Sequence, residues 1–169
     1  MHARNKQPAF TLIEVLMVVL IISILAALVI PQFQESATDA KDATLTHTLQ
    51  VIRKAIERFR AQHHGKPPGW NGQIETAYWH LVYYSDAAGS VSYVPDAAYP
   101  YGPYLPDLPK NPITGGAIFK PSTNPAGETP NENLKISGLV VGWFYDKATG
   151  RIAANATGST SSGVPRIQL

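Results

Sequence analysis

One stretch near the N-terminus limits the fold of this chain more than any other: FTLIEVLMVVLIISILAALVI, residues 10–30, in which nearly every side chain is apolar. As a helix that rises about 1.5 Å per residue, it would be about 31 Å long, which matches the hydrocarbon core of a bilayer. Glu14 is the exception within this run. Because a carboxylate in hydrocarbon is costly, an acid at such a position is expected to have a function.

The run allows two simple interpretations. A secretory signal peptide would begin with basic residues, as Arg4 and Lys6 do, but it would have a shorter apolar core and no acid inside it. A plain membrane anchor fits the length, and Arg4 and Lys6 would keep the N-terminus in the cytoplasm and place the rest of the chain outside. Neither interpretation explains Glu14.

A third interpretation comes from the segment AFTLIEVLMVVLIISILAALVIPQF, which resembles the N-terminus of type IV pilins and of the pseudopilins of type II secretion. The resemblance implies that a prepilin peptidase removes residues 1–9 as a cytoplasmic leader, by cutting between Ala9 and Phe10. Ala9 stands where the family usually has Gly. The peptidase would then methylate the new amine of Phe10. Glu14 matches the acid with which the family recruits each subunit into a helical filament.

Cleavage would also explain why an acid is tolerated in this helix. It creates a positive amine at Phe10 in the same apolar surroundings, so Glu14 of one subunit can pair with the Phe10 amine of its neighbour. Breaking a buried ion pair leaves one charge uncompensated, which costs about 3–5 kcal/mol in protein interiors. Phe10 and Glu14 are therefore the predicted assembly site.

Two further residues bear on how this helix behaves. Members of the family often carry a Gly inside the apolar helix and a Pro after it, which let the helix loosen in the filament; this chain has Ser23 and Pro31 there. Pro31 removes a helical hydrogen bond, at about 3 kcal/mol, and Ser23 can bond a preceding carbonyl and bend the helix. We predict one helix over about residues 10–64, interrupted or bent near Pro31. Pro31 either serves filament assembly or simply ends the membrane segment.

Beyond the apolar run, residues 31–169 have the pattern of a soluble domain. Apolar residues recur at helical spacing in one stripe, which comprises Leu45, Leu49, Ile52, Ile56 and Phe59. The sequence HHGKPPG then ends the helix, since Gly65 can take the left-handed cap conformation and Pro67 cannot continue a helix. A short second helix is predicted over residues 72–86, with aromatic side chains that either cover the core or contact a partner.

The C-terminal part predicts a small sheet. Residues 139–145 are rich in strand-forming types, DKATG supplies a turn, and residues 151–154 form the return strand. The loop GPYLPDLPKNPITG, residues 102–115, resembles the corresponding loop of the major (G-type) pseudopilins. The predicted fold is therefore α+β and pilin-like: a long N-terminal helix with a membrane-inserted first half, packed on a small antiparallel sheet, with a short intervening helix and loops rich in Pro and Gly.

The composition argues against several other classes of function. The chain has no Cys, which excludes disulfides, thiolate metal sites and a Cys nucleophile. The 14 Lys and Arg include Arg4 and Lys6, so removal of residues 1–9 leaves 12 of them against 12 Asp and Glu, a balance that gives nucleic acid little to bind. The five His residues and the scattered acids match no catalytic motif, and an enzyme is not expected.

The sequence offers little for a metal ion. Major pseudopilins commonly hold calcium in a C-terminal loop built from acids and backbone carbonyls. After Glu132 this chain has only Asp146, so no cofactor is expected; Asp146 is assigned to a turn, with a weaker carbonyl-based site near it as the alternative. The triplet Asn155-Ala156-Thr157 fits a glycosylation sequon, which arises easily by chance.

The leading hypothesis for function is a structural subunit of a type II secretion pseudopilus, the filament that drives folded proteins out of the cell. The resemblance implies as partners further copies of this chain, prepilin peptidase, the minor pseudopilins and the inner-membrane assembly platform. The chain would cross the inner membrane once, with a periplasmic globular domain. Two alternatives stay open: a type IV pilus subunit, which the absence of Cys disfavours, and a singly anchored binding module that uses its aromatic residues.

Overall fold

The computed structural model of the chain describes residues 10–169, apart from the side chain at position 31. The predicted leader, residues 1–9, and with it the cleavage residue Ala9, lies outside the described residues. The chain forms two compact units, Met1–Thr38 and Asp39–Leu169, and each is described by itself. The boundary between them falls within the first helix.

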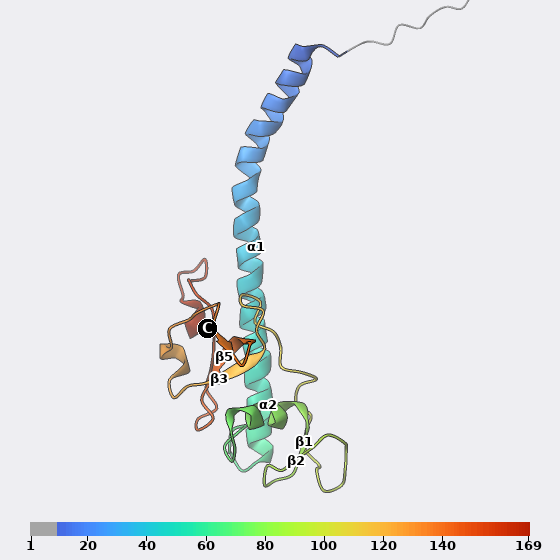
Figure 1. Ribbon diagram of the computed structural model, residues 1–169, viewed down its shortest axis with the longest axis vertical. Coiled ribbons are helices and arrows are strands. Elements are labelled where there is room, and N and C mark those ends of the chain that lie inside the picture. The colour runs from blue at the N-terminus through green and yellow to red at the C-terminus, as the bar shows by residue number, and fades with distance from the viewer. Residues whose placement is uncertain (1–9) are drawn as a thin grey trace, which may run out of the picture. The chain divides into compact units, whose positions relative to one another are not determined.

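That helix, α1, comprises Leu12–Gln62 and runs through position 31 without an interruption (Figure 1). The predicted interruption near Pro31 is therefore not found, although a proline within a helix removes one backbone donor. The helix ends two residues before the predicted position. His64 and Gly65 both have positive φ, at 56° and 78°, and the Gly65 N–H donates to the Arg60 carbonyl at 2.8 Å. Gly65 thus closes the helix with the predicted left-handed cap.

In the second unit, the predicted apolar stripe of α1 forms the centre of the core. Its five members are each at most 1% exposed: Leu45, Leu49, Ile52, Ile56 and Phe59. They pack in one cluster with buried residues from the rest of the unit, among them Leu81, Tyr104, Phe119, Trp143 and Tyr145. The stripe is confirmed, and its burial is the main reason why this half of α1 is stable.

The second helix, α2, comprises Ile74–Val82 and is shorter than predicted at both ends. Tyr83 is already extended, and Tyr84 and Ser85 form the first short strand. Ala77, His80 and Leu81 point into the core, whereas Trp79 is 39% exposed. The aromatic residues of this segment therefore divide between covering the core and facing solvent.

The strands form two sheets. Strands β1 (Tyr84–Ser85) and β2 (Val91–Ser92) make an antiparallel pair. The second sheet has four strands: β3 (Ile118–Pro121), β4 (Lys135–Ile136), β5 (Leu139–Tyr145) and β6 (Ile152–Ala154). The other three each pair with β5. A 3-10 turn, η1 (Pro125–Gly127), follows β3. A second, η2 (Arg166–Gln168), is the last element. The predicted hairpin of residues 139–154 is β5 and β6.

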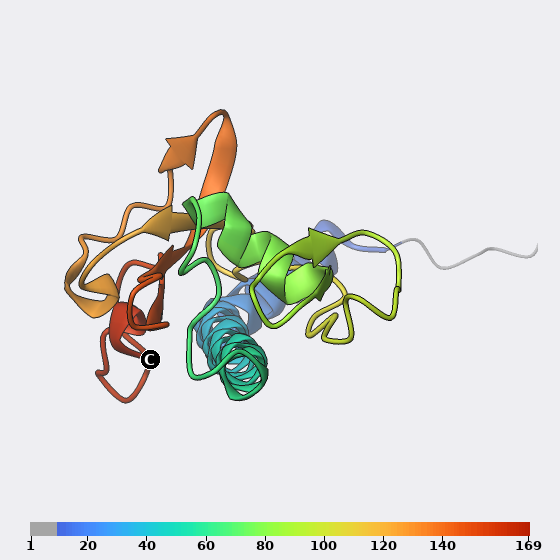
Figure 2. The same ribbon diagram turned by 90° about the horizontal axis from the view of Figure 1, so that it is seen from below.

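The α+β, pilin-like class is confirmed, and the sheet around β5 is mixed. Strands β4 and β6 run antiparallel to β5, but β3 runs parallel to it. The chain reverses between them through η1 and a long loop, so β3 and β5 can share a direction. Figure 2 looks along α1 and shows α2 and the β5 sheet placed around the helix.

A close backbone approach fixes where β3 meets β5. A Cβ added at Gly116 would lie 2.4 Å from the Val140 carbonyl oxygen, and one at Gly142 would lie 2.2 Å from the Gly116 carbonyl oxygen. No residue with a side chain fits at either position without moving the strands apart.

Candidate functional site

The predicted assembly site lies at the start of α1, and Thr11 is the residue that forms this helix end. The Thr11 side-chain oxygen accepts a hydrogen bond from the Glu14 N–H at 3.3 Å, and the Thr11 carbonyl accepts from the same N–H at 3.1 Å. Thr11 is thus the N-cap of α1, with Glu14 three residues on, as in a capping box. The sequence contains this signal as T-x-x-E, although no role was predicted for Thr11.

Glu14 lies in the first turn of α1 with its side chain exposed. A carboxylate there is stabilised by the positive end of the helix dipole, by about 0.3–1 kcal/mol. Within residues 10–169, no group donates a hydrogen bond to the Glu14 carboxylate or lies within 4 Å of it as a cation. The carboxylate is therefore available for a positive partner from another chain.

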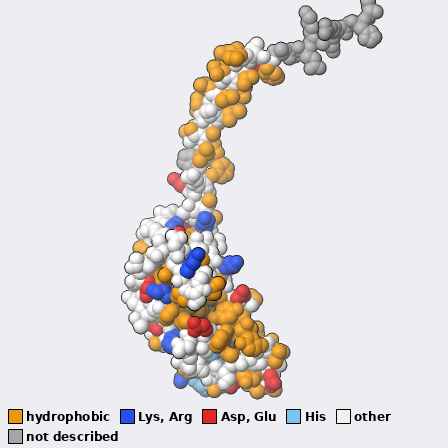
Figure 3. Space-filling model, viewed as in Figure 1, with side chains coloured by type: hydrophobic (Ala, Val, Ile, Leu, Met, Phe, Trp, Pro, Cys, Tyr) orange, Lys and Arg blue, Asp and Glu red, His pale blue; other side chains and the backbone are white. Residues whose placement is uncertain are grey.

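Apolar side chains surround Glu14 and continue along α1 on every side of the helix. From Phe10 to Ile30, each large apolar side chain is exposed, from 44% at Val29 to 86% at Leu12. Figure 3 shows orange side chains along this part of the helix, with white backbone between them. A surface of this size on a single helix requires a lipid environment or other helices to cover it.

Two other residues of this helix were predicted to affect it. Ser23 donates its hydroxyl hydrogen to the Val19 carbonyl at 2.7 Å, the back-bond that the sequence suggested. The same bond recurs further along, where Thr38, Thr44, Thr46 and Thr48 each bond the carbonyl four residues back. Position 31 lies inside the continuous helix, and a filament role for Pro31 stays a prediction.

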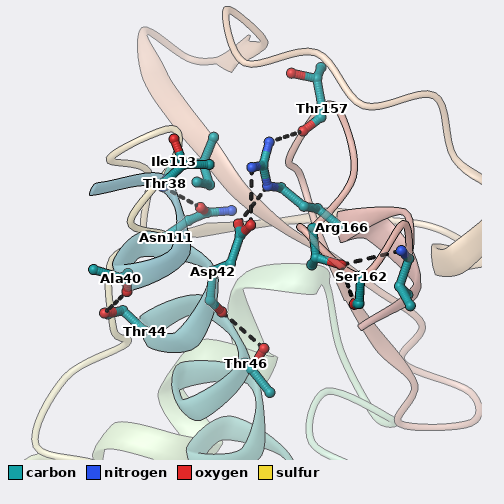
Figure 4. A network of polar contacts seen from close by, with 12 residues as sticks. Thr38, Ala40, Asp42, Thr44, Thr46, Asn111, Ile113, Thr157, Ser162 and Arg166 are labelled. Carbon is teal, nitrogen blue, oxygen red and sulfur yellow. Dashed lines mark hydrogen bonds and ion pairs between the residues drawn. The ribbon is translucent and has the colours of Figure 1, made fainter. Parts of the chain in front are cut away.

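A second site, absent from the sequence-based expectations, ties the C-terminal segment to α1. Arg166 Nε donates to Asp42 Oδ1 at 2.6 Å and Arg166 Nη2 to Asp42 Oδ2 at 3.1 Å (Figure 4). Arg166 Nη1 also donates to the Thr157 carbonyl at 2.9 Å. The hydrogen bonds to Asp42 raise the pKa of Arg166 above its ordinary value. We call this bidentate pair the Asp42–Arg166 clamp. It is hard to predict from the sequence because its partners are 124 residues apart.

The loop that resembles G-type pseudopilins has a definite structural role through Asn111, which is fully buried. The Asn111 amide donates to the carbonyls of Gly142 at 2.8 Å and Asn155 at 3.2 Å, and so joins β5 to the segment after β6. Its side-chain oxygen accepts from the N–H of Ile113 at 2.8 Å, which shapes the turn. A buried amide with every group bonded explains why this turn needs an Asn in this chain.

Asn155, the first residue of the predicted sequon, is also fully buried. Its amide donates to the carbonyls of Asn131 and Val141, at 2.8 and 2.9 Å. A glycan attached here would have to displace both bonds and enter the core. Asn155 therefore has a structural role, and the triplet is not a glycosylation site.

Asp146 has the turn role that the sequence predicted. Its Oδ1 accepts from the Ala148 N–H at 2.9 Å and its Oδ2 accepts from the Thr149 hydroxyl at 2.6 Å, and these bonds hold its pKa below the ordinary value in spite of partial burial. Across residues 10–169 there is no group of three or more His, Asp or Glu side chains that could hold a metal ion. Both Asp146 carboxylate oxygens accept hydrogen bonds within the turn, and the carbonyl-based calcium site near Asp146 stays the alternative prediction.

Two buried histidines form a cluster that the sequence did not suggest. The rings of His63 and His80 both lie against Phe59, at centroid distances of 3.8 and 4.8 Å, and are 6.5 Å from each other. His80 Nδ1 accepts from the Gly69 N–H at 3.0 Å, and its Nε2 donates to the Gly89 carbonyl at 2.9 Å. These bonds define one neutral tautomer, and burial lowers the pKa of His80. The cluster packs the core and offers no open path to a substrate.

Comparison with known proteins agrees with the N-terminal site. Residues 4–30 match the family described as "Prokaryotic N-terminal methylation motif". The chain is 35% identical over 69 residues to type II secretion system core protein G of Pseudomonas aeruginosa, which covers 41% of this chain and 49% of that protein. It is 30% identical over 67 residues to the protein of the same name from Escherichia coli K12, with 40% and 46% covered.

The matched region thus spans about half the length of these curated relatives. No solved structure matches the chain. By length and composition, α1 is also the one helix within residues 10–169 that could cross a membrane. The methylation motif and the apolar part of α1 concern the same N-terminal part of the chain.

Proposed function

We propose that this chain is a structural subunit of a type II secretion pseudopilus, the short helical filament whose assembly drives folded proteins out of the cell. The observation that carries the proposal is Glu14, an exposed carboxylate in the first turn of α1, in a stretch (residues 10–30) whose other large side chains are apolar. The N-terminal methylation motif over residues 4–30 and the similarity to core protein G support it.

Before assembly, the apolar part of α1 anchors the chain in the inner membrane. Arg4 and Lys6 favour a cytoplasmic N-terminus, so residues 39–169 fold in the periplasm. Prepilin peptidase cleaves between Ala9 and Phe10 and methylates the amine. At this stage Glu14 lies near the membrane interface, where an unpaired carboxylate is tolerated.

In the filament, the apolar helices of many copies cover one another. Each Glu14 then meets the Phe10 amine of a neighbouring copy, so two charges that are costly in an apolar bundle neutralise each other. The remaining partners that the family resemblance implies, the minor pseudopilins and the inner-membrane assembly platform, would act at this step. The globular units occupy the outside of the filament.

A type IV pilus subunit is the second candidate, because the N-terminal motif is common to both kinds of filament. The similarity to core protein G and the absence of Cys favour the secretion filament. A singly anchored binding module would need neither cleavage nor Glu14.

Deletion of the gene tests the proposal directly. We expect loss of protein secretion with surface fibres unchanged, and complementation by the full chain should restore secretion. Loss of fibres with normal secretion would favour the pilus subunit. The mass of the chain purified from a host with prepilin peptidase should correspond to residues 10–169 with one methyl group, and retention of residues 1–9 would refute processing.

A further inference from the structure

We propose that the exposed loop of residues 93–98 in one copy docks into an arginine-lined cavity of a second copy, with Asp96 as the central contact. The proposal rests on the filament function, because it assigns one of the contacts between globular units. It concerns surfaces of the unit Asp39–Leu169 and does not involve Phe10 or Glu14.

The charges of this unit are segregated along the sequence. The segment of residues 69–109, which contains α2, β1 and β2, has no Lys or Arg and carries four acids: Glu75, Asp86, Asp96 and Asp107. Within residues 10–169, none of the four has a Lys or Arg nitrogen within 4 Å; the ion pairs there involve Asp42, Glu57, Glu128 and Asp146. The segment therefore presents uncompensated negative charge.

The loop of residues 93–98 is the most exposed part of this acidic segment. All six residues are exposed, and Tyr93 and Val94 are 68% and 64% exposed. The Asp96 carboxylate accepts only from the nearby Ala98 N–H, at 2.9 Å, which holds the loop in a turn and leaves the second oxygen free. Figure 3 shows apolar side chains gathered over the region of β1, β2 and this loop.

Positively charged side chains line a cavity of about 450 Å³, which is formed by α1, η1 and the turn between β5 and β6. Its lining contains three guanidinium groups, those of Arg53, Arg60 and Arg151, and one acid, Glu57. Glu57 pairs with Arg60 at 3.0 Å. The lining therefore keeps an excess of positive charge.

Backbone contacts hold two of these guanidinium groups in place. Arg53 donates to a backbone oxygen of the last residue, Leu169, at 2.6 Å and to the Ile152 carbonyl at 3.3 Å. Arg151 donates to the Thr123 carbonyl at 3.3 Å, and its nearest acid, Asp146, is 3.9 Å away with its oxygens bonded to the turn. Groups held in this way lose little conformational entropy when they bind a carboxylate.

The two surfaces fit the chemistry of a protein interface. Arg and Tyr are enriched at such contacts, and opposite charges set their register and exclude wrong partners. A contact between two different surfaces of the same chain is heterologous, and repeated heterologous contacts build an open helical array. A symmetric contact of loop against loop would instead place Asp96 against Asp96. The chemistry thus points to a second copy of this chain as the occupant.

Cysteine crosslinking tests the contact in assembled filaments of the full chain, which has no Cys of its own. We expect Asp96→Cys with Arg151→Cys in one chain to give a ladder of disulfide-linked multimers under oxidation. A mixture of the two single variants should give dimers, and each single variant alone should give monomers. Asn133→Cys with Arg151→Cys is the control, with no ladder expected. Filaments without a ladder, or dimers from Asp96→Cys alone, would overturn the proposal.

Charge reversal gives an independent measurement. Asp96→Arg should lower the filament yield roughly tenfold, Arg151→Glu should do the same, and the double variant should recover most of the yield. Glu75→Arg with Arg151→Glu is the control and should show no recovery. Thermal unfolding of each variant establishes that it is folded. Normal yield from Asp96→Arg would refute this contact and leave the filament function intact, whereas failure of the unmodified chain to form filaments would refute the function itself.

Discussion

Arg166 holds Asp42 through both carboxylate oxygens, at 2.6 and 3.1 Å, and thereby fastens the last segment of the chain to the long helix. Both side chains are mostly buried, at 14% and 8% exposed. The guanidinium also donates to the Thr157 carbonyl, so it joins the two ends of the segment of residues 157–166. The pair is thus one of the polar contacts between α1 and the C-terminal segment, another being the bond from Arg53 to Leu169 at 2.6 Å.

Replacement of Asp42 by Ala should destabilise the protein by about 2–4 kcal/mol, because it leaves the Arg166 charge mostly buried and uncompensated. For a domain of this size, that corresponds to a fall of roughly 4–16 °C in the unfolding temperature. Thermal unfolding of the full chain in detergent measures it. The double variant Asp42→Ala with Arg166→Ala should lose less than the sum of the single variants.

The matched control is the exposed pair of Glu57 and Arg60, at i and i+3 on α1. Glu57→Ala should cost less than about 0.5 kcal/mol, as exposed helical pairs do. Equal losses from Asp42→Ala and Glu57→Ala would contradict the importance assigned to the clamp.

Glu14→Ala should abolish filament assembly while leaving cleavage and membrane insertion unchanged, because the variant removes the partner for the Phe10 amine and keeps the helix. Glu14→Gln is the sharper variant, since it preserves size and polarity and removes only the charge. Electron microscopy of filaments and the mass of the processed chain are the two measurements. The control is Glu35→Gln, an exposed acid further along the same helix, which should assemble normally. Filaments from Glu14→Gln at normal yield would refute the charge pair.

The stability of the globular unit should fall in mild acid because of His80. Burial is the main cause that lowers the pKa of His80 below its ordinary value of 6.5, and the nearby His63 ring acts in the same direction, whereas the Gly89 carbonyl and Asp86 oppose it. The unfolded chain therefore binds a proton more readily than the folded chain. Stability is fully present above pH 6.5 and is lost as the pH falls from there through the lower folded pKa.

Chemical unfolding at a series of pH values between about 4 and 8 measures this slope. His80→Gln should reduce the slope whatever its effect on stability at neutral pH. His47→Gln, at an exposed position on α1, should leave the slope unchanged. The same slope in His80→Gln and the unmodified chain would contradict the assignment.

Asn111→Ala should cost about 3 kcal/mol, because the carbonyls of Gly142 and Asn155 would remain buried without the amide that bonds them. Chemical unfolding gives the free energy. Asn133→Ala, at an exposed position, should change stability by less than about 0.5 kcal/mol. A small effect at Asn111 would mean that the turn after Pro109 holds the strands together without it.

The parts of the fold that could be predicted depend on neighbours in sequence. The stripe from Leu45 to Phe59, the Gly65 cap and the β5–β6 hairpin each follow from spacing within a few residues, and the structure confirms all three. The parallel pairing of β3 with β5 could not be predicted, because the pairing joins strands separated by a long loop and β3 has only four residues.

In the candidate sites, too, only residues marked by a local sequence pattern could be predicted. Glu14 could be found because a single acid in an apolar run is conspicuous, and the T-x-x-E pattern contained Thr11 as well. The Asp42–Arg166 clamp could not be found, since Asp42 is one of several charges on α1 and Arg166 follows a stretch rich in Ser, Thr and Gly. Long-range pairing of charged groups leaves no periodic pattern in the sequence.

The position of the clamp has a mechanical consequence. In the proposed filament, load would pass from the apolar helices to the globular units, and in this chain α1 joins Met1–Thr38 to Asp39–Leu169. Force transmitted along α1 enters the second unit just before Asp42, where Arg166 anchors the opposite end of that unit's chain. The ion pair therefore lies where load would enter this unit, and it resists sliding of the C-terminal segment along the helix together with the Arg53–Leu169 contact and the buried stripe of α1.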